Sequence, residues 1–369
     1  MVNAQEERVL IYWIWLSKLS KLTLKEKYLL LSRYTHPKAI FFAGSDGAKT
    51  VLGNKKLSYK DFDLTVCDAD LKWLNYSEFH HIVEIGSGFY PQKLREIYDP
   101  PIVLYAKGDI SCLNDIQISV VGSRKQTAFG RKMTSLLSGG LTKAGITISS
   151  GLALGVDATA HAECISIGGK TNAVLGCGID QIYPLANRTL FPKIMENGCL
   201  VSEFALGTPP RSQNFPVRNR LISGLSYGVV VIEAARRSGS LITARLALDQ
   251  GREVFAVPGS PFSSQSRGCN HLIKQGAKLV ECLDDILEEL VLDFRHAMEP
   301  RRDAENTASS LNVKEIDSSI LNWISFDPIS QDEIIQLSGL TSAEVSSMLL
   351  DMELVGAVSR DDNGFYSRL

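Results

Sequence analysis

The sequence predicts an α/β protein: a mostly parallel sheet, preceded by a helical domain and followed by a small helical domain. Three patterns support this class. Apolar residues recur at helical spacing over residues 1–75. Short β-branched runs then alternate with helical stretches over residues 116–290, which is typical of a parallel sheet covered by helices on both faces. Three more helical segments and a hairpin turn follow residue 312.

Composition narrows the class further. The chain has 369 residues, 44% of them hydrophobic, which is enough for two or three domains with sizeable cores. Its longest apolar stretches, residues 9–16 and 229–232, are shorter than the roughly 20 residues of a membrane span. Glu6 and Glu7 precede the first of them, which argues against a signal peptide. Seven cysteines without C-x-x-C spacing argue against a disulfide framework or a zinc knuckle, so we expect a cytoplasmic protein.

The net charge of −2 is unevenly distributed. Residues 113–290 contain 18 Lys and Arg against 14 Asp and Glu, a net of +4. Residues 311–369 contain 3 against 10, a net of −7. The middle of the chain is therefore suited to attract a polyanion, whereas the C-terminal region would repel one.

Individual elements follow from these patterns. We expect helices at 9–19 and 22–34, then a helix and an edge strand within 90–109, where Pro100 and Pro101 mark the turn. Helices are also expected at 131–145 and 241–251. The predicted strands are ISVVG (118–122), ITISSG (146–151), TNAVLG (171–176), CLVSE (199–203), GVVVIEA (228–234), EVFAVPG (253–259) and AKLVE (277–281).

The C-terminal region is predicted to be a separate winged-helix domain. Residues 293–312 are polar and irregular, which indicates a linker. In 313–369, helices are expected at 318–326, 329–340 and 341–354, with Ser330 and Thr341 as N-caps and Gly339 as a stop. Asp-Asn-Gly at 362–364 predicts a hairpin turn.

Glycine-rich loops mark the predicted strand ends of the middle domain. They are GSR (122–124), SGLALG (150–155), GCG (176–178) and RRSGSLIT (236–243). Each alone is consistent with an ordinary turn. Several in one parallel sheet, two of them with arginine, favour an anion site where helix N-termini present free N–H groups.

FPVRNR, residues 215–220, is the second unusual stretch. It places an aromatic ring and two arginines around an asparagine just before an apolar helix, a combination that suits single-stranded nucleic acid. The alternative is a buried Phe215 with arginines paired to Glu203 or Glu233.

A catalytic set is not evident. Asp157 and His161 are four residues apart on one helical face, but the simpler interpretation is an early-helix acid and a core histidine. Asn187 is interpreted as a helix N-cap. We predict no catalytic residues, no metal and no cofactor.

Four long stretches together resemble the DNA-processing protein DprA (Smf) family: VVGSRKQTAFG, SGLALGVDATAHAEC with the residues up to Asn187, LVSEFALGTPPRSQNFPVRNRLISGLS, and SGSLITARLALDQG with the residues up to Val280. The resemblance implies an extended Rossmann-like fold at 76–292, a SAM-like helical domain at 1–75, and a winged helix at 313–369. It implies binding of single-stranded DNA without sequence preference, a homodimer, and loading of the RecA recombinase during natural transformation.

The resemblance also implies site residues, all for single-stranded DNA. They are Gly122, Ser123 and Arg124; Phe215, Arg218, Asn219 and Arg220; Ser238, Gly239 and Ser240; and, as basic residues near these segments, Arg211 and Lys274. At the fifth position of SGLALG the family usually has arginine, whereas this chain has Leu154.

Two other functions are weighed against this one. A nucleoside-monophosphate phosphoribohydrolase-type enzyme would need a carboxylate near the position of Arg245, which argues against it. A sequence-specific regulator would need a basic reading helix, but residues 341–354 contain no Lys or Arg. For this acidic domain a protein contact is the better prediction.

Overall fold

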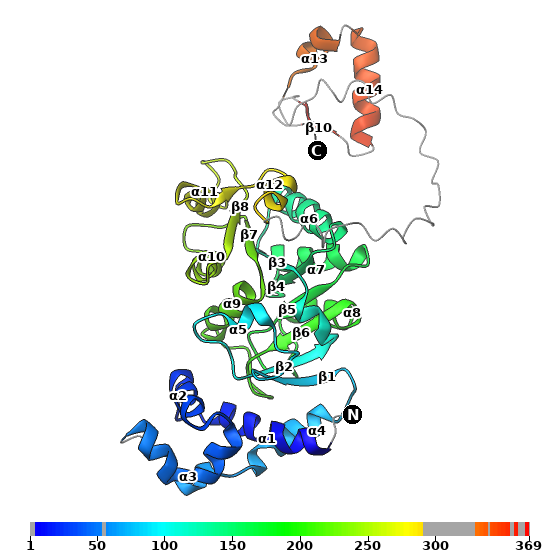
Figure 1. Cartoon of the computed structure of the whole chain (residues 1–369). Helices are drawn as coiled ribbons and strands as arrows, with labels where there is room; N and C mark the ends of the chain where they lie inside the picture. The colour runs from blue at the N-terminus through cyan, green and yellow to red at the C-terminus, as the bar shows by residue number, and fades with distance from the viewer. Residues whose placement is uncertain are drawn as a thin grey trace. The chain divides into compact units, whose positions relative to one another are not determined.

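The structure is a computed structural model that describes residues 4–53, 57–290, 329–338, 340–354, 358–360 and 366–368. It divides into two compact units, residues 1–300 and 301–369 (Figure 1). In the first unit, a group of helices precedes a large sheet that is covered by helices. Among the described helices none is long and apolar enough to cross a bilayer.

The chain begins with a small helical bundle. Both predicted helices are confirmed. Thr23 caps the second helix, because its hydroxyl accepts the Glu26 N–H and the Glu26 carboxylate accepts the Thr23 N–H at 2.9 Å. Trp15 lies in the centre of the bundle, against Phe41 and Phe62. The helices are α1 (Ala4–Lys18), α2 (Leu24–Tyr34), α3 (Pro37–Leu52) and α4 (Asp68–Leu74).

The sheet is mostly parallel, as predicted. Its strand order is β1-β2-β6-β5-β4-β3-β7-β8-β9. All pairs from β6 to β9 are parallel, and β1 and β2 add two antiparallel pairs at one side. The seven predicted strands are all present. The strands are β1 (His80–Glu84), β2 (Val103–Gly108), β3 (Gln117–Gly122), β4 (Thr147–Ser150), β5 (Thr171–Val174), β6 (Gly198–Ser202), β7 (Gly228–Ile232), β8 (Glu253–Ala256) and β9 (Lys278–Leu279).

One expectation about the edge of the sheet is wrong. Residues 90–109 do form helix α5 (Gln92–Arg95) and β2, but β2 is not the edge strand. HHIVE at 80–84 pairs antiparallel with it and lies outside it, from His80 opposite Lys107 to Glu84 opposite Val103. This short strand buries Ile82 and Val83, so covering β2 also extends the core.

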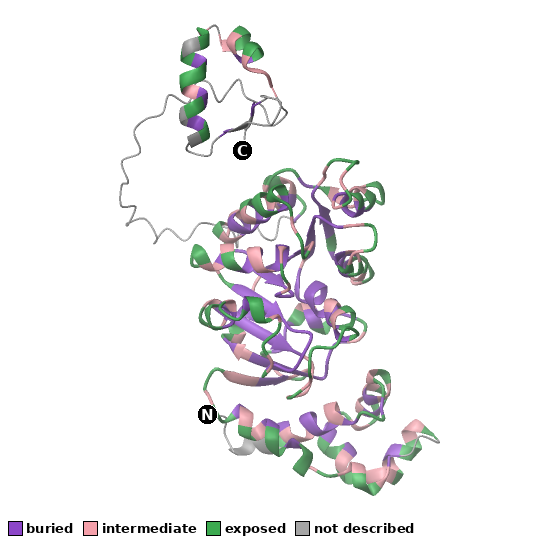
Figure 2. Cartoon of the chain, turned by 180° about the vertical axis from the view of Figure 1, so that it is seen from behind, coloured by how far each residue is buried: buried purple, intermediate pink, exposed green. Residues whose placement is uncertain are grey.

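Helices cover both faces of the sheet, and the strands between them are almost completely buried (Figure 2). Apolar residues of α6, α7 and α12 form one core with β3, β4 and β7. Apolar residues of α5, α9, α10 and α11 form another on the opposite face. These helices are α6 (Ala128–Lys143), α7 (Val156–Ser166), α8 (Leu190–Asn197), α9 (Asn214–Leu225), α10 (Gly239–Asp249), α11 (Arg267–Lys274) and α12 (Asp284–Leu287).

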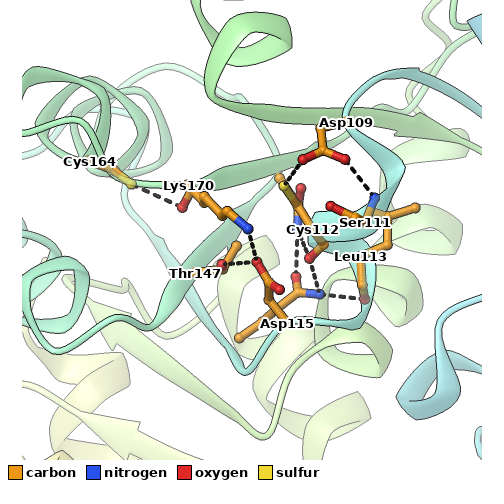
Figure 3. Close-up of polar contacts among 10 residues, drawn as sticks. Asp109, Ser111, Cys112, Leu113, Asp115, Thr147, Cys164 and Lys170 are labelled. Carbon is orange, nitrogen blue, oxygen red and sulfur yellow. Dashed lines mark hydrogen bonds and ion pairs between the residues drawn. The ribbon is translucent and has the colours of Figure 1, made fainter. Parts of the chain in front are cut away.

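Polar contacts close the amino-terminal edge of the sheet (Figure 3). Asp115 accepts hydrogen bonds from the Thr147 hydroxyl and from Lys170 Nζ, both at 3.1 Å. Asp109 accepts the Ser111 N–H at 2.9 Å, and Cys164 Sγ donates to the Lys170 carbonyl oxygen. Asp109, Asp115 and Lys170 at this edge therefore have partners within the protein.

The C-terminal unit contains α13 (Gln331–Ser338), α14 (Ser342–Leu354), β10 (Val358–Arg360) and β11 (Tyr366–Arg368). The predicted N-caps are confirmed, since Ser330 bonds Glu333 and Thr341 bonds Glu344. The two strands form the predicted antiparallel hairpin. The expected helix at 318–326, Gly339 and the turn at 362–364 lie outside the described residues.

The N-terminal helices and the sheet share one hydrophobic cluster that includes Trp15, Leu30, Ile82 and Tyr105. A buried polar contact accompanies it: the Tyr105 hydroxyl donates to Asp70 Oδ1 at 2.7 Å, and Lys18 pairs with the same carboxylate. The domain boundary near residue 75 stays a prediction.

Tyr105→Phe tests this contact. Asp70 is fully buried, so losing one donor leaves its charge less well compensated. We expect the free energy of unfolding in urea to fall by about 1–3 kcal/mol with an unchanged m-value. Tyr98→Phe is the control, because Tyr98 is 90% exposed. An effect no larger than that of Tyr98→Phe would contradict the structural role of the contact.

Candidate functional site

A groove of about 510 Å³ lies at the carboxyl-terminal edge of the sheet. It is formed by the loops after β3, β4 and β7 and by the first turns of α9 and α10. After β3, the strands β4, β5 and β6 are added on one side of it, whereas β7, β8 and β9 are added on the other side. The order of strand addition therefore reverses at β3. Ligands of open α/β sheets bind at such switch points.

Most of the predicted site residues meet in this groove. Nine of the twelve line it: Gly122, Ser123, Arg124, Phe215, Arg218, Asn219, Ser238, Gly239 and Ser240. Arg211 is exposed between two lining residues, Pro210 and Ser212. Lys274 is exposed in the last turn of α11 and does not line the groove, and neither does Arg220.

Close strand packing explains the glycine that begins the first loop. A Cβ on Gly122 would lie 1.9 Å from the Ile232 carbonyl oxygen of β7. Only glycine therefore lets β3 and β7 remain paired up to the groove floor. The chain then turns away from β7 and exposes Arg124.

Phe215 is the centre of an aromatic and cationic cluster. The Arg124 guanidinium carbon lies 5.7 Å from its ring centroid, and that of Arg218 lies 5.9 Å away. The Tyr183 ring is 5.5 Å from it, tilted by 39°. Both distances between arginine and ring fit cation–π contacts. Sequence reasoning missed Tyr183, which follows β5 by nine residues and is brought here by a loop.

FPVRNR does not precede a helix, as we expected, but forms the first turns of α9. Proline at residue 216 is tolerated there because N–H groups of the first turn have no helical acceptor. The helix puts Phe215, Arg218, Asn219 and Ile222 on the face that lines the groove. Arg220 lies on another face for the same reason.

Arg218 combines a structural and a lining position. Its side chain is 4% exposed, and Nη1 donates to the Gly151 carbonyl at 3.0 Å and to the Val174 carbonyl. These carbonyls follow β4 and end β5, so Arg218 ties two strand ends together. Burial lowers the pKa of Arg218 to about 10, which leaves the guanidinium charged at neutral pH.

Arg220 has the structural role that the sequence left open as an alternative, because it pairs with Glu203. It makes two hydrogen bonds to Glu203, at 2.9 and 2.7 Å, and one to Asp99 at 3.0 Å. Its side chain is largely buried, so the pair acts as a clamp between α9, the end of β6 and the α5 region. Glu233 instead bonds Thr127.

The motif GVDATAHAEC is structural in its contacts. Asp157 is buried and accepts the N–H groups of Gly151 and Ala153 at 3.2 and 3.3 Å. His161 is fully buried, with Nδ1 2.6 Å from the Thr171 hydroxyl, and burial lowers its pKa to about 3. Its imidazole is therefore neutral at pH 7.

Asn187 does not cap a helix, as we had expected. It ends a short 3₁₀ turn, and its Nδ2 donates to the carbonyls of Leu152 and Ala153 at 2.9 and 3.2 Å. The amide thereby fixes the SGLALG loop against the segment that contains Tyr183.

Apart from Asp157 and Tyr183, the residues that line the groove belong to chain segments that contain no acidic residue. Residues 116–156, 204–232, 234–248 and 254–280 have no Asp or Glu. Asp157, which lines the groove, and Glu233, which lies two residues before the lining residue Ala235, are both buried, whereas Arg124, Lys125, Arg236 and Arg237 are exposed. No metal-binding group of acidic, His or Cys side chains occurs among the described residues. A cationic groove with an aromatic centre suits a polyanion that has aromatic rings, because these rings can stack on Phe215.

Comparison with known proteins agrees with this geometry. The family model of DNA recombination-mediator protein A matches residues 81–291. The chain belongs to this family. The model of the DprA winged helix domain matches residues 304–364, so the C-terminal unit is a winged helix. The chain is thus a DNA-processing protein of the DprA family.

Several relatives support the assignment. Protein Smf of Escherichia coli is 39% identical over 81% of this chain and 80% of its own length. DNA processing protein DprA of Bacillus subtilis is 46% identical over 56% of this chain and 70% of its own length. The crystal structure of DprA from Streptococcus pneumoniae has a TM-score of 0.65 and 36% identity, covering 76% of this chain and 97% of that one. A structure that describes the single-stranded DNA binding mode of DNA processing protein A from Helicobacter pylori has a TM-score of 0.53 and 31% identity. It covers 58% of this chain and 96% of that one.

Arg220→Ala tests the clamp. Removing the guanidinium leaves the largely enclosed Glu203 carboxylate without its cation, so we expect the free energy of unfolding to fall by about 3–5 kcal/mol. Arg245→Ala is the control, because Arg245 is exposed on α10, and it should change stability by less than about 0.5 kcal/mol. Denaturant unfolding measures both. Equal stability of the two variants would show that the clamp contributes nothing.

Proposed function

We propose that the groove binds single-stranded DNA without sequence preference. The observation that carries the proposal is Phe215, whose ring has two guanidinium groups within 6 Å in a groove lined mostly by acid-free segments. Phe215 is half-buried, and the part of an aromatic face that is open to a groove stacks on any base, with each stacked base contributing about 1–3 kcal/mol. In this proposal, exposed Arg124 holds a backbone phosphate beside that base.

A strand without a partner fits this groove better than a duplex does. Stacking on Phe215 and Tyr183 requires bases that have left their own stack, which a duplex provides only after costly unpairing. The relative from Helicobacter pylori, whose single-stranded DNA binding mode is known, supports the same choice.

The groove is better suited to binding than to cleavage. Among the described residues that line the groove, Asp157 alone has a carboxylate. This carboxylate accepts hydrogen bonds from two backbone N–H groups. Burial raises its pKa, and nearby Arg218 opposes that shift. A group held in this way is engaged by its own loop and does not reach a substrate. This favours a binding protein over the phosphoribohydrolase-type alternative.

The family supplies the wider role that we propose. Bound strands would be protected and loaded with RecA during natural transformation, and the protein would act as a cytoplasmic homodimer. The acidic winged-helix domain would contact protein, because α14 presents Glu344 in its first turn and contains no Lys or Arg. A negative surface opposes DNA but suits a basic partner surface.

Arg124→Ala is the first test of the groove. We expect single-strand affinity to fall about tenfold or more, roughly 1.4 kcal/mol, with the slope of log K against log salt reduced by about 0.7 for the lost phosphate contact. Fluorescence anisotropy of a labelled oligonucleotide at several salt concentrations measures both. Lys143→Ala is the matched control, because it removes an exposed charge at the other end of α6. If the two variants behave alike, the groove is not the binding site.

Leu154→Arg is a gain-of-function test. Leu154 is 43% exposed and lines the groove extension beside Arg124, Tyr183 and Phe215. A new guanidinium there should add a phosphate contact, so affinity should rise several-fold and the salt slope should steepen by about 0.7. Ile167→Arg is the control, since Ile167 is 40% exposed at the opposite end of α7. A gain from both variants would indicate a general charge effect.

A further inference from the structure

Glu233 occupies an unusual position at the switch point. It directly follows β7, is 5% exposed, and adopts a left-handed φ of 54°. A residue other than glycine keeps such a backbone only where surrounding contacts fix it. Contacts of the Glu233 side chain must therefore hold this backbone conformation.

Those contacts direct the carboxylate to the amino end of α6. Oε2 accepts the Thr127 N–H at 2.8 Å, and Oε1 accepts the Thr127 hydroxyl. Thr127 is the N-cap of this 16-residue helix, and its Oγ1 in turn accepts the Gly130 N–H at 3.1 Å. A Cβ on Gly130 would lie 2.3 Å from Oε2, so the carboxylate rests against the first helical turn.

The helix supplies the positive end that this carboxylate needs. In residues 4–53 and 57–290, as described, no Lys, Arg or His forms an ion pair with Glu233. The Thr127 N–H and hydroxyl, together with the dipole at the amino end of α6, compensate the charge instead. Glu233 thus acts as an internal anion bound at a helix N-terminus.

This location is where nucleotide phosphates bind in related sheets. In open α/β folds the pyrophosphate of a dinucleotide sits on the N-terminus of the helix after the first strand, at the switch point. Here that strand is β3 and that helix is α6. A second anion at the same helix end would meet the Glu233 carboxylate at close range, which is strongly unfavourable in a buried place.

We propose that Glu233 is a specificity-determining residue that excludes free nucleotides and terminal phosphates from the switch point. Its carboxylate takes the phosphate position on α6, so that the polynucleotide backbone contacts Arg124 in the groove instead. The proposal rests on the proposed binding of single-stranded DNA and adds which phosphates the groove accepts.

The experiment uses the full chain with inorganic pyrophosphate and ADP as probes. Glu233→Gly removes the carboxylate and suits the left-handed backbone, and Glu233→Asn replaces it by a shorter neutral group that tolerates this φ. We expect the wild type to bind neither probe below millimolar concentration by calorimetry. Both variants should bind pyrophosphate at least tenfold more tightly and show a higher Tm in its presence.

Asp157→Asn is the matched control, because it neutralises another buried carboxylate of the same sheet edge, one that lines the groove from α7. It should leave pyrophosphate unbound. Three results would each overturn the proposal: submillimolar binding by the wild type, no gain in whichever Glu233 variant folds, or an equal gain in Asp157→Asn. Oligonucleotide binding by the wild type is measured in parallel, so that failure of the proposed function is seen separately.

Discussion

The site depends on one buried guanidinium. Arg218 reaches from α9 to the Gly151 and Val174 carbonyls and so fixes the ends of β4 and β5 relative to the helix that carries Phe215. A buried arginine costs solvation energy, and it is tolerated here because carbonyl oxygens and the nearby Asp157 compensate its charge. Without this arrangement, the loops after β4 and β5 would lose their shared support.

Around the groove, acidic side chains are buried and most basic side chains are exposed. The acids, Asp157 and Glu233, are buried and satisfied by backbone N–H groups and by Thr127, so their charges face the protein. The exposed charges beside them belong to Arg124, Lys125 and Arg236. A polyanion therefore meets cations and an aromatic ring, whereas the anions needed to hold the loops stay inside. The amino-terminal edge differs, because Asp115 and Lys170 pair with each other there.

The two arginines of FPVRNR show how far sequence reasoning reaches. The composition of the segment suggested both a nucleic-acid surface and a structural clamp, and the structure contains both features in one helix. Helical spacing alone separates them, since residues 215, 218, 219 and 222 share the groove face and Arg220 does not. The separation was missed because the segment was expected to precede the helix. Tyr183 had no comparable signal, because a loop and not a periodic element carries it to Phe215.

By itself the sequence determined the α/β class, the seven core strands, the loops at their ends and the family, because hydrophobic periodicity, glycine positions and local motifs are encoded along the chain. Tertiary structure alone decided that β1 covers β2, that Arg220 pairs with Glu203, and that Glu233 meets the N-cap of α6. The physical reason is sequence distance. Glu233 and Thr127 are 106 residues apart, and which acid compensates which donor depends on strand order and burial.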